Sequence, residues 1–414
     1  MLKTKPTRTT TVEIHLLKTF ATSVINRDDE GFPKTTVHGG VTRGRWSSQS
    51  WKRCMRIHFE TAELIDPENL AVRTRKIPRV IADDLAARGM DPADAEKLAV
   101  NLVWGAGMLN TDAANAEAKN ANVLLFLAPS EIAKMAERLY EQRTELLAVA
   151  APIENVFPAD EEGVKKSKGD RKAACPKQFQ ELGKDLLKGL DARRAADVAL
   201  FGRMLATEPG ANVVAAANVA HSFGVGELIQ ISDFYTSGDD LAAADTEQAS
   251  TGFMGAAHFD APTLYQYASL NVGQLAANLD GDDKLVQQTV RAFLHAAVHA
   301  QPTAKMAGTA PFTRPCLVLV IVRDDLPLSL ANAFLKPVTP RGGRDVEENA
   351  ALALARHIKQ QHEMYGTDER VKAYHAWLGD PALFDDVNKL PGESEPVATM
   401  IDRAAAMAVL REGV

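Results

Sequence analysis

The segment from Gly31 to Phe59 constrains this chain more than any other, because it carries six Lys or Arg residues and no Asp or Glu. The 414-residue chain has a formal net charge of −7, so the segment is +6 and the remainder is −13. A local reversal of charge on an acidic protein is expected where the protein meets a polyanion. A charge run is also common on an ordinary solvated helix face. The residues alone leave both interpretations open.

The second half of this segment predicts a helix from about Ser48 to Phe59, because Ser47 or Ser48 can cap its first turn. Such a helix has two distinct faces. The face expected to pack on a sheet contains Trp51, Cys54, Met55 and His58. The face expected to point outward contains Gln49, Lys52, Arg53 and Arg56. With the free amides and positive dipole end of the helix N-terminus, the outward face suits a row of phosphates.

The composition is that of an ordinary globular protein, with 46% hydrophobic and 24% charged residues. Its length allows two or three domains. Because the chain is acidic overall, any polyanion site must be local. No secretory signal or membrane-spanning run is predicted. The three cysteines form no Cys-x-x-Cys pair, so neither a disulfide framework nor a zinc cage is indicated. We therefore expect a cytoplasmic location and no contact with a membrane.

The pattern of expected elements predicts an α+β fold. Strands are expected at residues 11–20, 264–270 and 316–322, and helices at 271–279 and 283–298. The region from residue 60 to about 191 is rich in Ala, Glu, Lys and Leu, with the clearest helices at 81–103 and 129–151. Without its insertions, the chain is compatible with a ferredoxin-like βαββαβ sheet whose halves are separated by a helical insertion.

Three other segments complete the expected organisation. Residues 197–207 are a short apolar segment followed by a Glu208-Pro209-Gly210 turn, which fits a projecting hairpin or loop. Residues 233–258 are polar and acidic and predict a long loop, which in a compact domain usually has a function. From residue 347 onward, we expect two or three terminal helices.

Few residues suggest catalysis. Asp28 and Asp29 could form a carboxylate site for acid–base chemistry or Mg²⁺, but they are more typical of a turn that orders its own backbone. His295 and His299 lie at i, i+4 on an expected helix, yet no third metal ligand is evident. The sequence has no nucleotide-binding glycine motif and no aromatic RNP signature. A sheet that binds nucleic acid here would therefore use loops and the basic helix, without bases stacked on its face.

A collinear series of motifs extends along roughly residues 10–340. Its first part consists of Asn26-Arg27-Asp28-Asp29, Gly39-Gly40 and Arg45-x-Ser47-Ser48-Gln49-Ser50-x-Lys52-Arg53-x-Met55-Arg56. Its later part consists of Ala199-Leu200-x-Gly202-Arg203-Met204, Ala220-His221, Asp239-Asp240-Leu241, Tyr265-x-Tyr267-Ala268-x-Leu270-Asn271, Ala304-Lys305 and the run from Leu326 to Phe334. This series resembles the CasC family, the backbone subunit of type I-E CRISPR Cascade.

The resemblance implies a palm with an RRM-like (ferredoxin-like) fold, a large helical insertion called the fingers, and a projecting thumb hairpin. It assigns the palm to residues 1–59, 212–235 and 263–345, the fingers to 60–190, and the thumb to 191–211. It also implies a loop at 236–262 that contacts a neighbouring subunit or RNA, and C-terminal helices at 346–414.

The resemblance further implies a non-enzymatic scaffold that binds CRISPR guide RNA (crRNA) and displays it for pairing with target DNA in antiviral defence. Copies would associate head to tail along the crRNA, which generates a helical oligomer. The implied partners are crRNA, target DNA, other copies of the chain and other Cascade subunits. No catalytic residue, cofactor or metal is implied.

The family's motifs also imply individual contacts. The expected RNA-binding residues are Arg27, Lys34, Arg45, Ser47, Gln49, Lys52, Arg53, Arg56, Arg203, Met204, Thr236 and Lys305. Met204 falls where the family's thumb inserts beside a displaced nucleotide, a role that suits a flexible, polarisable side chain. Without the resemblance, Met204 would be interpreted as a core methionine. Contacts with target DNA are implied for Lys165, Lys166, Lys168 and Lys172 in the insertion.

Two other functions stay open. Related backbone subunits of type III effectors cut bound RNA with a loop aspartate, so Asp28 or Asp29 leaves a Mg-dependent endoribonuclease as the alternative. A small-molecule enzyme that uses the region of His221 and His258 is a third hypothesis.

Overall fold

The chain has an α+β architecture, as predicted, and divides into two compact units that are described separately. The computed structural model describes residues 10–157, 174–192, 195–206, 208–238, 251–366, 371–379 and 393–412. As far as residues are described, unit 1 comprises Met1–Leu64, Ala217–Gln274 and Val286–Val414, and unit 2 comprises Ile65–Ala216 and Leu275–Leu285. Among these residues, no helix combines the length and the hydrophobicity that crossing a bilayer requires.

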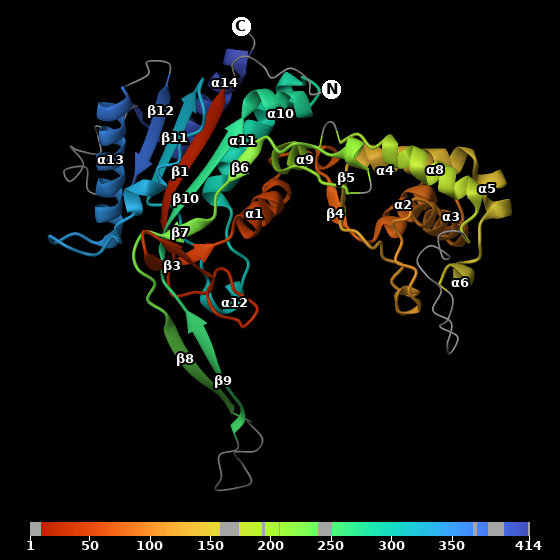
Figure 1. The fold of residues 1–414 in the computed structure, drawn as a ribbon, viewed down its shortest axis with the longest axis horizontal. Helices are drawn as coiled ribbons and strands as arrows, with labels where there is room; N and C mark the ends of the chain where they lie inside the picture. The colour runs from red at the N-terminus through yellow and green to blue at the C-terminus, as the bar shows by residue number, and fades with distance from the viewer. Residues whose placement is uncertain are drawn as a thin grey trace. The chain divides into compact units, whose positions relative to one another are not determined.

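Unit 1 is built on one mixed sheet with the strand order β13-β12-β11-β1-β10-β7-β3-β2, and β6 also pairs with β10. Its strands are β1 (Thr11–Thr19), β2 (Thr35–His38), β3 (Val41–Trp46), β6 (Ala217–Val219), β7 (Ser222–Gly224), β10 (Thr263–Asn271), β11 (Leu317–Arg323), β12 (Lys372–Trp377) and β13 (Glu393–Ser394). β1 lies between β10 and β11 and is antiparallel to both, with Leu16 opposite Gln266 and Val318. The three long strands predicted from the sequence therefore form the centre of this sheet (Figure 1).

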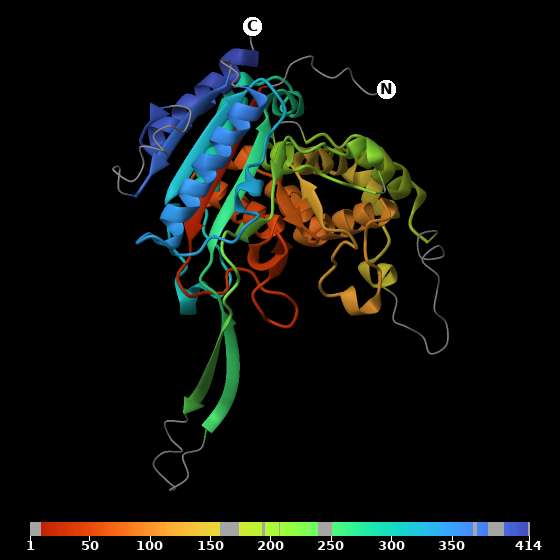
Figure 2. The same ribbon diagram turned by 60° about the vertical axis from the view of Figure 1, so that its left-hand side comes forward.

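Helices cover both faces of the sheet (Figures 1 and 2). The helices of unit 1 are α1 (Ser48–Thr61), most of α11 (Asp283–His299), α12 (Met306–Thr309), the 3₁₀ helix η5 (Ala331–Phe334), α13 (Val346–Tyr365) and α14 (Val397–Glu412). α10 (Val272–Asn278) begins in unit 1 and continues into unit 2.

The burial of β1 shows how these helices are placed. Leu17 faces one side and belongs to a buried cluster with Leu354 and Ile358 of α13. Lys18 faces the other side, close to Cys54 of α1. Because both faces are covered, β1 is buried from its first residue to Lys18, although its alternating apolar and polar residues are typical of a half-buried strand.

The region after residue 346 contains strands as well as the predicted helices. β12 is antiparallel to β11, with Leu317 opposite Trp377 and Val322 opposite Lys372. β13 then pairs with β12 in parallel. The prediction of helices alone was wrong here, because β12 is stabilised by pairing with a distant strand, which local sequence patterns do not reveal.

Residues 231–238 and 251–259 pair as a β-hairpin where a loop was predicted. β8 (Ile231–Gly238) and β9 (Thr251–Phe259) are antiparallel, with Ile231 opposite Phe259. The expected loops at 233–258 and 236–262 are therefore corrected for the described part, while residues 239–250 lie outside it. Small and polar residues had indicated a loop, but mutual pairing satisfies the backbone of both segments. In both views the hairpin extends away from the sheet (Figures 1 and 2).

Unit 2 is predominantly helical, as the composition of the insertion predicted. Its helices are α2 (Ile77–Ala87), α3 (Pro92–Gly105), α4 (Pro129–Glu141), α5 (Arg143–Val149), α6 (Ile153–Val156), α8 (Lys177–Lys188) and α9 (Ala196–Phe201), with short 3₁₀ helices η1 (Pro67–Asn69), η2 (Ala113–Asn115) and η3 (Pro209–Ala211). It also contains a two-stranded sheet of β4 (Val72–Thr74) and β5 (Leu125–Leu127).

The single helix predicted at 81–103 is in fact two helices. α2 ends before Gly89, whose φ of +91° is a conformation that glycine adopts readily. Asp91 then caps α3, and Pro92 occupies its first turn. The helix predicted at 129–151 is likewise divided between α4 and α5.

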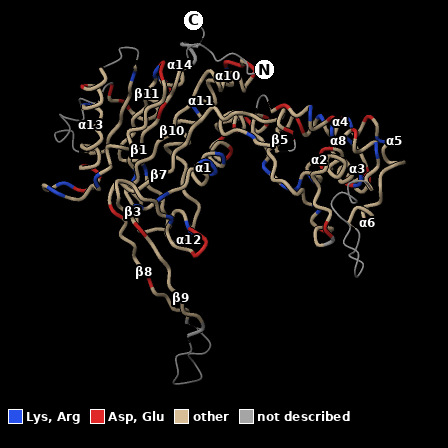
Figure 3. Tube along the Cα trace, in the orientation of Figure 1, with Lys and Arg blue, Asp and Glu red and all other residues tan. Residues whose placement is uncertain are grey.

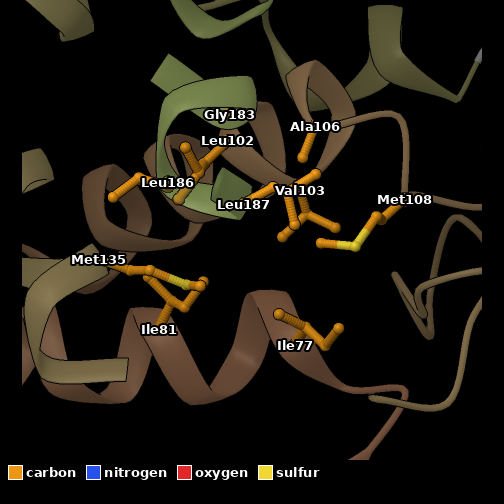
Figure 4. Close-up of a pocket in the computed structure, with 10 residues that line it drawn as sticks. All are labelled: Ile77, Ile81, Leu102, Val103, Ala106, Met108, Met135, Gly183, Leu186 and Leu187. Atoms are coloured by element: carbon orange, nitrogen blue, oxygen red, sulfur yellow. The ribbon is translucent and has the colours of Figure 1, made fainter. Parts of the chain in front are cut away.

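The core of unit 2 is closely packed where α3 and α8 cross. A Cβ atom on Gly183 of α8 would lie 2.5 Å from the backbone nitrogen of Ala106. Beside this crossing is a hollow of about 10 Å³ lined only by apolar residues, among them Ile77, Val103 and Met135 (Figure 4). A hollow this small is a packing gap of the core and not a ligand site.

The described residues of the range 191–211 do not form the projecting hairpin that was predicted. α9 ends at Phe201, Gly202 has a φ of +81°, and Arg203 exchanges two backbone hydrogen bonds with Val213. The described residues of this range include no strand. They belong to unit 2 with the helical insertion. The apolar residues of α9 are buried there, which explains why they do not extend as a hairpin.

Candidate nucleic-acid interface

Helix α1 begins where the sequence predicted, and two side chains fix its start. Ser47 is the N-cap: its Oγ accepts the N–H of Ser50, with 3.3 Å between oxygen and nitrogen. The N–H of Ser47 donates to Asn26 Oδ1 at 2.9 Å. Asn26 thereby ties the loop that precedes β2 to the first turn of the helix. Ser47 is buried, and its side chain positions the helix N-terminus.

The two faces of α1 lie as the periodicity predicted. The apolar face buries Trp51, Cys54 and Met55. On the outer face, Gln49 and Arg53 are exposed, and Lys52 and Arg56 are half-buried. No acidic residue occurs in this helix before Glu60. The outer face therefore presents cations beside a helix N-terminus, whose amides and dipole also favour anions.

His221 completes this surface, although it was not among the residues predicted to bind RNA. Its Nδ1 accepts the N–H of Ser48 at 3.2 Å and lies 3.4 Å from Arg45 Nη1. Burial lowers the pKa of His221, and nearby cations lower it further, namely Arg45, Lys34 and Lys52. A neutral imidazole whose Nδ1 accepts carries its proton on Nε2, which can donate to a phosphate. The motif Ala220-His221 was the only sequence signal for this residue.

We call this set of residues the α1 surface. It consists of Lys34, Arg45, Gln49, Lys52, Arg53, Arg56 and His221. All lie in unit 1. The pairing of β3 with β7 brings the two distant segments together, with Arg45 opposite Phe223.

The loop that precedes β2 carries two of the predicted contacts. Arg27 is exposed and Lys34 is half-buried. Within this loop, Asp28 Oδ1 accepts the N–H groups of Glu30 and Phe32 at 3.1 and 2.9 Å. Asp28 therefore orders its own turn, as the sequence predicted.

Arg43 is one of the six basic residues of the segment, but it does not contribute to the α1 surface. Its side chain is fully buried. Its guanidinium donates to the carbonyl oxygens of Gly224, Val225 and Phe334. Arg43 thus joins β3 to β7 and to the segment that follows β11, so the charge presented outward is smaller than the sequence count suggested.

Arg203 was predicted to contact RNA. This prediction is wrong, because the structure shows its side chain buried in an ion pair. Arg203 Nη1 lies 2.8 and 2.9 Å from the two carboxylate oxygens of Glu131, and Arg203 Nε donates to Ala211 O at 3.0 Å. Both side chains of the ion pair are almost completely buried. Moving this guanidinium to a phosphate would leave a buried carboxylate unpaired, at a high cost in free energy.

The remaining residues that were predicted to make contacts are either exposed or lie outside the described part of the chain. Met204 is 87% exposed, which excludes the core methionine that it resembled when considered alone. Thr236 lies on β8 and Lys305 lies at the start of α12, and both are exposed. Met204 belongs to unit 2, whereas the other two belong to unit 1. The lysines predicted to contact DNA lie outside the described residues; they are Lys165, Lys166, Lys168 and Lys172.

The histidines on α11 take part in a contact of three rings. His58 Nε2 lies 3.2 Å from His295 Nδ1, and the ring centroids of His295 and His299 are 4.4 Å apart. Burial lowers the pKa of all three, that of His299 to about 4. No group of three or more His, Cys, Asp or Glu among the described residues could hold a metal ion. The three rings therefore pack α1 against α11, and His258 stacks separately on Phe32, with 4.1 Å between centroids.

The sheet face that carries Tyr265 and Tyr267 is covered by α13. The two side chains are buried. The hydroxyl of Tyr267 donates to Glu13 Oε1 at 2.7 Å, and the hydroxyl of Tyr265 accepts the N–H of Leu330 at 3.0 Å. These two rings cannot stack on bases, in agreement with the sequence, which lacks an RNP signature.

Comparison with known proteins places the chain in a family. The family model described as "CT1975-like protein" matches residues 12–401. A chain of a solved "CRISPR RNA-guided surveillance complex, pre-nicking" is 31% identical with a TM-score of 0.75, over 96% of this chain and 100% of that chain. A chain of another "CRISPR RNA-guided surveillance complex" is 29% identical with a TM-score of 0.66, over 96% and 99%. No curated protein sequence matches. The chain belongs to the CT1975-like protein family.

Proposed function

We propose that the chain is a crRNA-binding backbone subunit of a type I-E Cascade surveillance complex. The observation that carries this proposal is the α1 surface: cations, a helix N-terminus and a neutral imidazole, on a chain that is acidic elsewhere. Such groups bind phosphates whatever the base sequence, which suits a subunit that must accept every guide. Membership of the CT1975-like family and the likeness to chains of CRISPR surveillance complexes support the proposal.

The sheet of unit 1 is proposed to be an RRM-like palm. Strands β11, β1, β10 and β7 are neighbours in that order and are antiparallel. α1 follows β1 in the chain, and α11 follows β10. These relationships are those of a βαββαβ unit. Because α13 covers the aromatic face, the RNA would lie along α1 and the adjoining loops.

Copies are proposed to associate head to tail along the crRNA. The β8–β9 hairpin supports this, because several large apolar side chains on it are exposed: Ile231, Phe234, Tyr235, Phe253 and Met254. An isolated two-stranded hairpin is marginally stable, and exposed apolar patches mark interaction sites. A neighbouring copy or RNA would cover these side chains, and open association of this kind generates a filament.

Met204 is proposed to insert beside a displaced nucleotide, so that the RNA between such points is presented for pairing with target DNA. Its exposure is compatible with this role. The assembly would act in the cytoplasm with other Cascade subunits in antiviral defence. We propose no catalytic role and no cofactor for this subunit.

The proposal is tested by purifying the tagged chain with its partners from its own cells and sequencing the bound RNA. We expect uniform repeat-spacer transcripts. An assembly that is free of nucleic acid would overturn the proposal.

The endoribonuclease alternative is tested with the same material. RNA complementary to the guide should stay intact in the presence of Mg²⁺. Cleavage that disappears in Asp29→Ala, an exposed residue of the loop before β2, would establish the alternative.

A further inference from the structure

A second cationic site lies beside α13, in the same unit as the α1 surface. The segment from Asn332 to Arg341 and the exposed side of α13 enclose a hollow of about 330 Å³. The basic residues that line it are Lys336, Arg341, Arg356 and His357. None of the described residues that line the hollow is Asp or Glu. Figure 3 shows Lys and Arg residues both in the segment before α13 and along α1.

The hollow and the α1 surface are associated with opposite faces of the sheet. α13 packs on the face that carries Leu17. Lys18 points to the other face, toward Cys54 of α1. A polyanion held at α1 would therefore not reach this hollow without passing around the edge of the sheet. The residues that line the hollow also have no part in the proposed contacts with crRNA.

A buried asparagine holds the backbone of the hollow in place. Asn349 on α13 is 8% exposed, and its Nδ2 lies 3.1, 3.3 and 3.4 Å from the carbonyl oxygens of Thr339, Arg341 and Arg344, respectively. Directly before Thr339, the N–H of Val338 donates to Val225 O at 2.9 Å. The segment is thus fixed to α13 and to the end of β7.

A tight turn then presents two of the arginines. Arg341 and Arg344 exchange backbone hydrogen bonds of 3.1 and 3.2 Å. The two residues between them, Gly342 and Gly343, have φ values of +64° and +73°, which glycine adopts without strain. Because the backbone is already ordered, a ligand would have to order only the exposed ends of the side chains.

The cations of this site are not neutralised within the described part of the chain, where no ion pair involves any of them. The residues concerned are Lys336, Arg341, Arg344 and Arg356. All four are exposed. Elsewhere on α13, by contrast, Lys359 lies 3.8 Å from Glu363. The positive charge of these side chains is therefore available to a ligand.

We infer that this hollow binds the phosphodiester backbone of a nucleic-acid strand, at a site separate from the α1 surface. Two of the three exposed cations that line it are arginines, Arg341 and Arg356, and Arg344 lies in the adjoining turn. The planar guanidinium groups of arginines bind phosphate oxygens in a bidentate manner. The volume is within the range of sites that enclose small organic groups. Leu335 also lines the hollow and is 48% exposed, which provides an apolar contact for a sugar or base.

The first test measures protection of single arginines in the full-length protein. Phenylglyoxal modifies accessible guanidinium groups, and mass spectrometry of peptides reports Arg341, Arg344 and Arg356 separately from the arginines of α1. Short oligo(U) or oligo(dT) should protect these three residues, and comparison of the two probes distinguishes RNA from DNA. Polyglutamate should not protect them. Equal protection by polyglutamate, which would indicate an acidic protein partner, or no protection by either oligonucleotide, would overturn the inference.

The second test uses Arg341→Ala/Arg356→Ala and the dependence of oligonucleotide affinity on salt. Loss of two phosphate contacts should flatten the slope of log K against log salt by about 1.4, at about 0.7 for each contact with a single strand. The control is Arg291→Ala/Lys359→Ala, which removes the same charge from exposed positions outside the hollow. The control should leave the slope unchanged.

The outcome separates this inference from the proposed function. Lys52→Ala/Arg53→Ala alters the α1 surface alone. If only Lys52→Ala/Arg53→Ala flattens the slope of log K against log salt, the second site is rejected and the proposed function stands. If only Arg341→Ala/Arg356→Ala flattens it, the second site stands and the α1 surface is rejected.

Discussion

Nη1 of Arg203 lies 2.8 Å from Oε1 of Glu131, and each of these side chains is only 1% exposed. The pair joins residues that are 72 positions apart in the sequence. Glu131 is also part of the capping of α4, because its Oε2 accepts the N–H of Ala128 at 2.8 Å. The ion pair therefore attaches the loop after α9 to the start of α4 within unit 2.

Arg203→Ala should lower the free energy of unfolding of unit 2 by about 3–5 kcal/mol, because the Glu131 carboxylate would stay buried without its partner. Urea denaturation measures this loss. Arg138→Ala removes a solvent-exposed pair with Asp185 and should cost less than about 1 kcal/mol. Unchanged stability combined with weaker RNA binding would instead restore the role in RNA contact that the sequence suggested for Arg203.

Lys52→Ala/Arg53→Ala should weaken binding of single-stranded RNA to a similar extent for every sequence. The slope of log K against log salt should fall by about 1.4 if each residue makes one phosphate contact. Fluorescence anisotropy with two unrelated RNA sequences measures both effects. Lys284→Ala/Arg291→Ala removes two exposed cations from α11 and serves as the control. A loss confined to one of the two RNA sequences would argue against contact with the backbone.

Acid should destabilise the protein through His15, a fully buried residue whose Nδ1 lies 2.9 Å from the hydroxyl oxygen of Tyr265. Burial, assisted by the charge of Arg323, lowers the pKa of His15 from 6.5 to about 3. The unfolded chain takes up a proton below pH 6.5 and the folded chain does not, so stability falls as the pH decreases from 6.5 toward 3. At pH 4.5 the loss is about 2.7 kcal/mol, at about 1.36 kcal/mol per pH unit.

Urea midpoints at pH 7 and pH 4.5 test this effect. In His15→Asn, which has no titrating group, the difference between the two midpoints should be smaller than in the natural sequence. His299, whose pKa is lowered to about 4, should contribute in the same direction in both proteins. An equal difference in the two proteins would show that His15 is not the source.

Gly183→Ala should destabilise unit 2, although alanine is the better helix former by about 1 kcal/mol. The added Cβ would lie 2.5 Å from the backbone nitrogen of Ala106, so α3 and α8 would have to separate. Overpacking of this kind costs about 1–3 kcal/mol. Gly189→Ala is the matched control, because its nearest contact would be an ordinary 3.5 Å from Asp185 O. Thermal unfolding of the two variants should therefore shift in different directions or by clearly different amounts.

The parts of the fold that could be predicted from the sequence are those whose signals are local. The start of α1 was correct because Ser47 and the periodic residues after it lie within one short segment. The insertion was recognised as helical for the same reason. Its division at Gly89 could have been predicted from the Gly89-Met90-Asp91-Pro92 sequence, which combines a helix end with a new cap.

The parts that could not be predicted depend on partners far away in the sequence. His221 accepts a hydrogen bond from Ser48, 173 positions earlier, and no local pattern around either residue indicates this. In sequence, Arg43 resembles the neighbouring surface cations. Its carbonyl partners lie 181 or more positions further along the chain, so its burial could not be predicted locally. The β8–β9 hairpin was missed because small, polar and acidic residues predominate over the few large apolar ones across residues 233–258, and the two strands are defined by their pairing with each other.

The membership of unit 2 has a consequence for how this protein could be shortened. Its main part, Ile65–Ala216, would seem removable as a single cassette, but Leu275–Leu285 belongs to it as well. There, the amide of Asn278 donates to Ala199 O and Val214 O, and Leu279 is completely buried. Excising residues 65–216 alone would leave the Asn278 amide without its acceptors and would expose the Leu279 side chain. The resulting apolar surface would favour aggregation. Because two separate segments of the chain form unit 2, a shortened protein requires both segments to be redesigned together.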